Sequence, residues 1–243
     1  MATLVGAPSQ PQFDSDSRER RFYLRMAWTI GGIVLAGFGG YILAGISSFS
    51  APWWVHVHAV SYMAWIVLFL NQNLLVVQGD FAAHRRMGMV MAALALWMVL
   101  VGSVLLFASV AAHRAPPVFS VAMLFAMDEL GIFIFAGLVA AGIALRRRSD
   151  WHKRLMLGAT ILLIHPAVGR LTVLTIGFSW PVIILALLAL VAIAAGFDWR
   201  NRGKVHPALL LVGGIIAAYG LVVPLLAQLP ALNTFANTVA AGG

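Results

Sequence analysis

The chain has 243 residues, of which 62% are hydrophobic and only 10% are charged. Soluble domains carry about 25% charged residues, so this composition excludes a soluble globular protein and indicates an integral membrane protein. The formal net charge of +8 does not indicate nucleic acid binding, because the basic residues lie mainly in loops between apolar segments. The sequence has no cysteine, which excludes disulfide bonds, thiolate-bound metals and a cysteine nucleophile.

Apolar stretches of spanning length occur seven times, since a membrane helix needs about 20 residues. We expect an all-α fold in which residues 22–243 form a single bundle of seven transmembrane helices, preceded by a polar cytoplasmic tail over residues 1–21. We expect no cleavable signal peptide, because acidic residues precede the first apolar stretch. The predicted spans are 22–45, 55–77, 87–111, 118–144, 154–176, 178–197 and 206–228.

The loops between these spans predict the orientation of the protein. Of the 16 lysines and arginines, all except Arg114 and Arg170 precede the first span or lie in alternate loops on one side. Basic loops stay in the cytoplasm, so we expect a cytoplasmic N-terminus and an outside C-terminus. The expected location is a bacterial inner (cytoplasmic) membrane, with the lipid bilayer rather than nucleic acid as the partner. Small residues in the first and last spans allow either internal packing or a homo-oligomer or larger complex.

Polar side chains of the second span and its outer boundary are candidate ligands. His56, His58 and His113 lie at the outer face, where imidazoles bind copper or zinc, although alternate residues on a helix diverge. Asn71 and Gln72 lie in the inner half of the second span. Amides there either form hydrogen bonds between helices or bind a quinone or substrate carbonyl.

Two further histidines begin helices at the cytoplasmic boundary. His84 opens the third span and His152 opens the fifth. Two interpretations remain open. Imidazoles at this depth contact lipid headgroups, or, because they lie at matched depth, they serve as the two axial ligands of a haem b between the third and fifth spans.

Four ionisable residues lie deep within two consecutive spans, where charge is costly. Asp128 and Glu129 lie in the fourth span, and His165 and Arg170 in the fifth. We expect a carboxylate to pair with Arg170, which leaves the second acid free to titrate or to bond His165. Pro166 should weaken the local helix. The set is predicted to be either a buried ion pair that holds two helices or a relay or ligand site.

Several chemistries are excluded by what the sequence lacks. Both lysines, Lys153 and Lys204, lie at the inner boundary, so no retinal Schiff base can form in the middle of the membrane. The sequence has no zinc-hydrolase motif, no serine-hydrolase elbow and no phosphate-binding loop. No catalytic residue is therefore predicted.

One set of motifs comprises His58, Trp65, Gln72, His84-Arg85-Arg86 with Gly88, the run from Arg147 to Met156, and Pro166 with Arg170. This set resembles a widespread family of uncharacterised bacterial multi-pass membrane proteins, which implies no assigned reaction. More loosely, the spacing from His58 to His84 resembles the ascorbate-dependent transmembrane b-type cytochromes, which hold two haems with histidines on four consecutive helices. That resemblance implies an inner ligand pair of His84 and His152. The outer pair is incomplete, because the fourth span has no histidine at its outer end.

These observations leave two classes of function. The first is a redox or proton-linked membrane protein that holds a haem b or a quinone and uses the intramembrane residues as a relay. The second is a non-enzymatic protein, either a small-solute or lipid carrier or an accessory subunit of a larger membrane complex.

Overall fold

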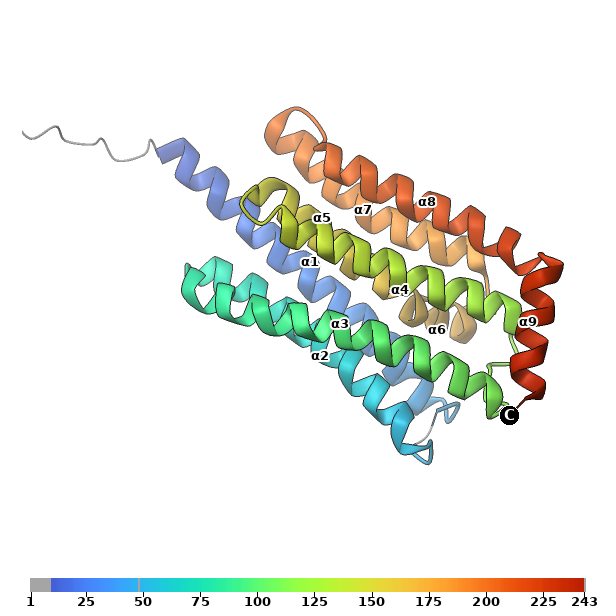
Figure 1. Ribbon diagram of the computed structural model, residues 1–243. Coiled ribbons are helices and arrows are strands. Elements are labelled where there is room, and N and C mark those ends of the chain that lie inside the picture. Colours follow the sequence, from blue (N-terminus) through green and yellow to red (C-terminus); the bar gives the residue numbers. More distant parts are fainter. Residues whose placement is uncertain (1–9, 48, 243) are drawn as a thin grey trace, which may run out of the picture.

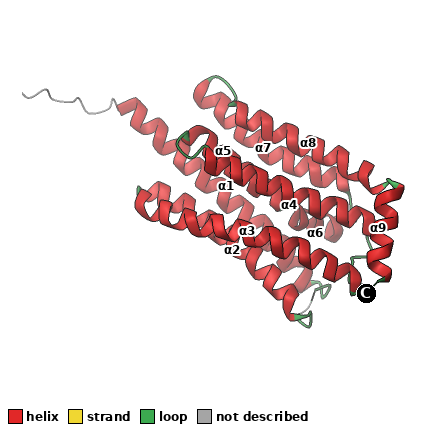
Figure 2. Ribbon diagram, in the orientation of Figure 1, coloured by secondary structure: helices red, strands yellow, loops and turns green. Residues whose placement is uncertain are grey.

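A computed structural model describes residues 10–47 and 49–242, and this part of the chain is helical with no strand (Figures 1 and 2). The predicted all-α fold is therefore confirmed. The helices are α1 (Gln10–Leu43), α2 (Trp53–Gln78), α3 (Phe81–Ala111), α4 (Val121–Ala144), α5 (Ser149–Leu163), α6 (His165–Thr175), α7 (Trp180–Arg202), α8 (Pro207–Ala227) and α9 (Pro230–Ala241).

The lengths and composition of these helices are those of a multi-pass membrane protein. Six of the described helices are long and apolar enough to cross a bilayer. The pair α5 and α6 passes the same test as one span that is bent by 41°. A total of seven spans, together with the orientation of the termini, stays a prediction.

The bend between α5 and α6 has a local cause. Pro166 has no backbone N–H, and its ring crowds the carbonyl four residues earlier, which belongs to Leu162. That carbonyl instead lies 3.1 Å from Nδ1 of the His165 ring. The predicted weakening of the helix at this proline is confirmed, because the span is broken into α5 and α6 beside it.

Several helices begin or end beyond the predicted spans. The first helix begins at Gln10, so part of the predicted polar tail is helical, while residues 1–9 lie outside the described residues. The third begins at Phe81, after Asp80, whose side chain accepts a hydrogen bond from the Ala83 N–H at 2.9 Å. Helix α7, which corresponds to the sixth predicted span, continues to Arg202, beyond the predicted end at residue 197. The extensions of α3 and α7 arise because the Asp80 cap and the ion pairs of Arg202 hold helical turns outside the apolar stretches.

The last helix was not predicted. Helix α9 follows the final apolar stretch, crosses the end of the bundle and packs against α3 and α4 (Figure 1). Its Phe235 ring lies 6.0 Å from Phe107 of α3 and 5.4 Å from Phe125 of α4. Aromatic contacts of this kind give a short helix a fixed place on the bundle.

Helix α4 is the centre of the bundle and packs against α3, α5, α8 and α9. The fully buried Trp65 of α2 reaches this centre, with its ring edge-on to Phe135 and its Nε1–H donating to Thr160 Oγ1 at 3.2 Å. The start of α1 and the α2–α3, α4–α5 and α7–α8 loops lie together at one end of the bundle (Figure 1). We call this the basic end, because most of the arginines and lysines lie there.

Candidate functional site

The structure brings His84 and His152 together at the basic end. His84 lies in the first turn of α3 and His152 in the first turn of α5, and their ring centres are 6.3 Å apart. The two ring planes stand at 89° to each other. Neither ring is fully buried, which is consistent with a position near the end of the bundle.

Neighbouring helices fix both histidines. His152 Nδ1 lies 2.8 Å from the Gly142 carbonyl of α4, which orients the ring and leaves Nε2 as its free nitrogen. Gln72 of α2 donates from Nε2 to the His84 carbonyl at 3.1 Å. His84 Nδ1 and Gln72 Oε1 are both buried without a hydrogen-bond partner among the described residues. Buried polar atoms of this kind are rare and require an explanation.

The spacing of this histidine pair fits a metal held between the rings. An imidazole–metal bond is about 2 Å long, so two in-line ligands place their ring centres about 6 Å apart. The observed 6.3 Å matches this value. The Nδ1 of His152 forms a hydrogen bond with the Gly142 carbonyl, and a backbone carbonyl is a usual partner for the second nitrogen of a metal-binding imidazole. The distance between the two ring centres therefore matches that of two imidazoles that share one metal ion.

A charged network beside this pair was not predicted from the sequence. Arg154 of α5 is 0% exposed and forms an ion pair with Asp198 of α7, which is 1% exposed. The Nε of Arg154 donates to Asp198 Oδ2 at 2.8 Å, and its Nη1 donates to the Asp150 carbonyl at 2.9 Å. The sequence signal for this network is Asp198, a lone acid that lies one residue beyond the predicted end of the sixth span.

Other charged side chains surround this buried pair. Glu19 of α1 lies 2.8 Å from Lys153 and 3.2 Å from Arg202, and Arg202 also donates to Asp150 at 2.8 Å. The backbone N–H of His206 donates to Asp198 at 3.2 Å. Partial burial, followed by the positive charge of Arg154, lowers the pKa of the His206 imidazole below its ordinary value. The network thus ties α1, α5 and α7 together at the basic end.

The intramembrane residues are only partly brought together. His165 Nε2 lies 3.7 Å from Asp128 Oδ1, so these two residues face each other across α6 and α4. Glu129 points elsewhere, because its Oε2 accepts a hydrogen bond from Ser103 of α3 at 3.0 Å. Its other oxygen is buried without a hydrogen-bond partner among the described residues.

The expected ion pair between Arg170 and a carboxylate does not form in the described part of the chain. Arg170 donates from Nη1 to the Pro166 carbonyl at 3.0 Å, and its guanidinium carbon lies 4.1 Å from the Phe38 ring centre and 5.3 Å from that of Tyr41. The side chain of Arg170 therefore lies against α1 and not against an acid of α4. The depth of Arg170 along its span can be estimated from the sequence, but the direction of its side chain about the helix axis cannot.

Arg170→Ala is expected to lower the free energy of unfolding by less than about 2 kcal/mol, the upper range of a desolvated cation–π contact. The substitution leaves no carboxylate without its partner, so the larger cost of breaking a buried ion pair should not appear. Thermal unfolding of the purified protein in detergent measures the difference. A loss of about 3–5 kcal/mol would show that the guanidinium does neutralise an acid.

Aromatic side chains enclose His165. Its ring lies 5.9 Å from Tyr219 of α8 and 6.4 Å from Trp180 of α7, centre to centre. The Tyr219 hydroxyl donates to the Met127 carbonyl at 2.8 Å, and Trp180 donates to the Gly220 carbonyl at 2.8 Å. The imidazole is therefore held in a rigid setting with one nitrogen toward Asp128.

The outer histidines do not converge on a metal site. His56 Nε2 lies 3.0 Å from the Ala51 carbonyl, and His58 stacks on Tyr62 at 4.3 Å between ring centres. His113 lies after α3 with a φ of 53°. Across residues 10–47 and 49–242, no three His, Asp or Glu side chains lie together as metal ligands. Because His56 and His58 are two residues apart on α2, their side chains point in different directions and meet different partners, as their angular spacing predicts.

Among the described residues, the predicted ligand Asn71 and the neighbouring Asn73 form no hydrogen bond to another helix. Asn73 donates to the Phe69 carbonyl of its own helix at 2.8 Å. Asn71 is half-buried on α2. Of the amides in this span, only Gln72 links two helices at the histidine pair.

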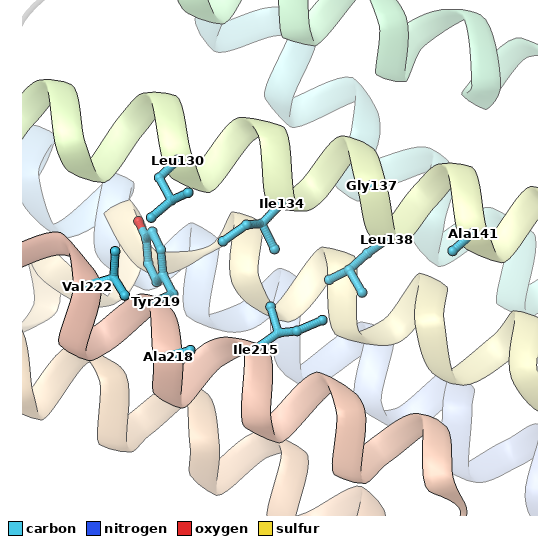
Figure 3. A pocket seen from close by; sticks show the side chains of 9 residues that line it. All are labelled: Leu130, Ile134, Gly137, Leu138, Ala141, Ile215, Ala218, Tyr219 and Val222. Carbon is cyan, nitrogen blue, oxygen red and sulfur yellow. The ribbon is translucent and has the colours of Figure 1, made fainter. Parts of the chain in front are cut away.

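Two apolar grooves lie along α4. One, of about 500 Å³, lies between α4 and α8, where Leu130, Ile134 and Leu138 face Ile215 and Tyr219 (Figure 3). The second, of about 580 Å³, is bounded by α3, α4, α8 and α9 and includes Glu129 in its lining. Leu130 borders both grooves. Apolar grooves between helices of a membrane protein accommodate lipid chains, so an apolar lining alone does not define a specific site.

Comparison of the chain with protein-family models, with curated proteins and with solved structures found no significant match.

Proposed function

We propose that this integral membrane protein is a redox protein in which His84 and His152 hold one haem b near the basic end. The single observation that carries the proposal is the pair of imidazoles 6.3 Å apart, contributed by α3 and α5. The haem would supply one-electron transfer. A single haem is proposed, because the fourth helix offers no histidine for a second pair.

The surrounding residues have defined tasks in this proposal. The Gly142 carbonyl fixes the His152 tautomer by accepting from Nδ1, so that Nε2 would be the atom that binds the haem iron. Gln72 holds the first turn of α3 through the His84 carbonyl and thereby positions the second ligand. Arg85, whose charge acts on His84, would pair with a propionate, since guanidinium groups favour carboxylates.

The proposal is tested by the absorption spectrum of protein purified from haem-replete cells. We expect a Soret band at one haem per chain, and its loss in His84→Ala and in His152→Ala. His84→Met should retain haem with a shifted spectrum and a higher potential, because a thioether replaces one imidazole. His113→Ala, in a loop remote from the pair, is the matched control and should keep the wild-type spectrum.

Two results would overturn the proposal. One is a colourless preparation that remains colourless after reconstitution with haemin. The other is a Soret band that His84→Ala and His152→Ala leave unchanged while both variants remain folded by circular dichroism.

A further inference from the structure

The groove of about 580 Å³ that α3, α4, α8 and α9 border has one polar side chain, Glu129, among the described residues of its lining. The other lining residues are phenylalanine, leucine and alanine. An acid that borders an apolar groove in a membrane protein is costly unless it meets a partner. The position of Glu129 therefore distinguishes this groove from the wholly apolar surface that a lipid chain requires.

The described residues satisfy only one oxygen of this carboxylate. Oε2 of Glu129 accepts a hydrogen bond from the Ser103 hydroxyl of α3 at 3.0 Å, which holds the carboxylate between α3 and α4. Oε1 is buried and has no hydrogen-bond partner in the described part of the chain. No lysine, arginine or histidine belongs to the described lining of the groove. The carboxylate thus lacks both a counter-charge and a second donor there.

Three aromatic rings from three helices pack together in the same lining. The ring centres of Phe107 and Phe125 are 5.0 Å apart, and Phe235 lies 6.0 Å from the first and 5.4 Å from the second. All three residues line the groove together with Glu129. Aromatic faces attract cations, and a cluster of rings beside a carboxylate is a setting that favours an organic ammonium group.

The groove is bordered by apolar side chains that the rest of the protein does not cover. Phe133 is 58% exposed, and the lining residues Leu229 and Phe235 are also exposed. Exposed apolar side chains of this kind mark a surface that contacts membrane. A ligand reaches Glu129 from the lipid side, so it needs an apolar body as well as a charge.

We propose that this groove binds a lipophilic amine in its protonated form, with the ammonium on Glu129 and the apolar body against the aromatic rings. An ammonium supplies the donor that Oε1 lacks, through a charge-assisted hydrogen bond. A neutral ligand would leave the carboxylate without a counter-charge, and an anion would be repelled, so charge selects the cation. The volume of the groove is that of sites for drug-sized molecules. This inference does not depend on the haem.

The headgroup of phosphatidylethanolamine also carries an ammonium. We commit to a free amine, because Glu129 lies about 12 Å along α4 from its start at Val121. Headgroups lie at the ends of spanning helices, and an ammonium tied to a phosphate stays at that level. The experiment includes this lipid as a separate arm.

The test uses three probes of the same shape and different charge, which are 4-phenylbutylamine, 4-phenylbutan-1-ol and 4-phenylbutanoate. Each is titrated into the full-length protein in phosphatidylcholine nanodiscs, with empty nanodiscs as the blank. We expect the amine to give a saturable heat of binding above the blank. The alcohol and the carboxylate should bind at least about tenfold more weakly, because neither supplies a positive charge.

Variants locate the site. The isosteric Glu129→Gln should weaken binding of the amine at least about tenfold. Asp128→Asn is the matched control, since this neighbouring acid faces His165 and not the groove, and binding should be unchanged. Phe235→Leu removes one ring at an exposed position and should weaken binding about two- to fivefold. If Glu129→Gln fails to fold, the three probes and Phe235→Leu decide.

Four outcomes would overturn the inference. The amine does not bind, or the alcohol and the carboxylate bind as tightly as the amine. Glu129→Gln remains folded and binds the amine like the wild type. Alternatively, the amine binds in phosphatidylcholine nanodiscs but is displaced when phosphatidylethanolamine is included, which would assign the groove to a lipid headgroup.

Discussion

Asp198→Ala is expected to lower the free energy of unfolding by about 3–5 kcal/mol, because it leaves the Arg154 guanidinium buried without its counter-charge. Arg154 is 0% exposed, and its other carboxylate contacts are longer, at 3.4 Å to Glu19 and 3.5 Å to Asp150. The substitution also removes the carboxylate that accepts a hydrogen bond from the His206 backbone N–H. Denaturation of purified wild-type and variant protein in mixed micelles measures the difference.

Asp150→Ala is the matched control, because Asp150 belongs to the same network but its side chain is 44% exposed. Exposed pairs contribute about 0–1 kcal/mol, so this variant should unfold close to the wild type. The double variant Arg154→Met with Asp198→Leu should recover most of the lost stability, because no buried charge then lacks a partner. Equal losses for Asp198→Ala and Asp150→Ala would contradict the distinction between buried and exposed members.

Gly37→Ala is expected to destabilise the bundle by about 1–3 kcal/mol or more, as overpacking does in a close-packed interior. A Cβ at this position would lie 2.4 Å from the Ala167 carbonyl oxygen of α6. The obstacle is backbone and not the end of a flexible side chain, so α1 and α6 would have to move apart. The same movement would shift Phe38 from Arg170, and thermal unfolding of the variant measures the cost.

Gly39→Ala provides the control for helix propensity. It lies in the same helix, and a Cβ there would meet no atom within 4 Å. Alanine is a better helix former than glycine by about 1 kcal/mol, so this variant should match or exceed the wild-type stability. A Gly37→Ala variant as stable as Gly39→Ala would show that α1 and α6 are not in close contact.

The spans were predictable because hydropathy is a local and additive property of the sequence. Each predicted span coincides with a helix or with the bent pair α5 and α6, and Pro166 marked the bend. Helix ends were less predictable. Asp80 and the ion pairs of Arg202 extend α3 and α7 beyond their apolar stretches, and α9 follows from aromatic packing onto helices far away in the sequence.

The sequence by itself determined that this is a multi-helix membrane protein and that ionisable residues lie inside its apolar spans, where charge is energetically unfavourable. Both conclusions follow from residue type and from position along each span. Only the tertiary structure decided which of those residues meet. Depth along a span does not fix rotation about the helix axis, so it could not show that Arg170 turns to Phe38 while Asp128 turns to His165. It also could not pair Arg154 with Asp198, because that contact depends on how α5 and α7 pack at the basic end.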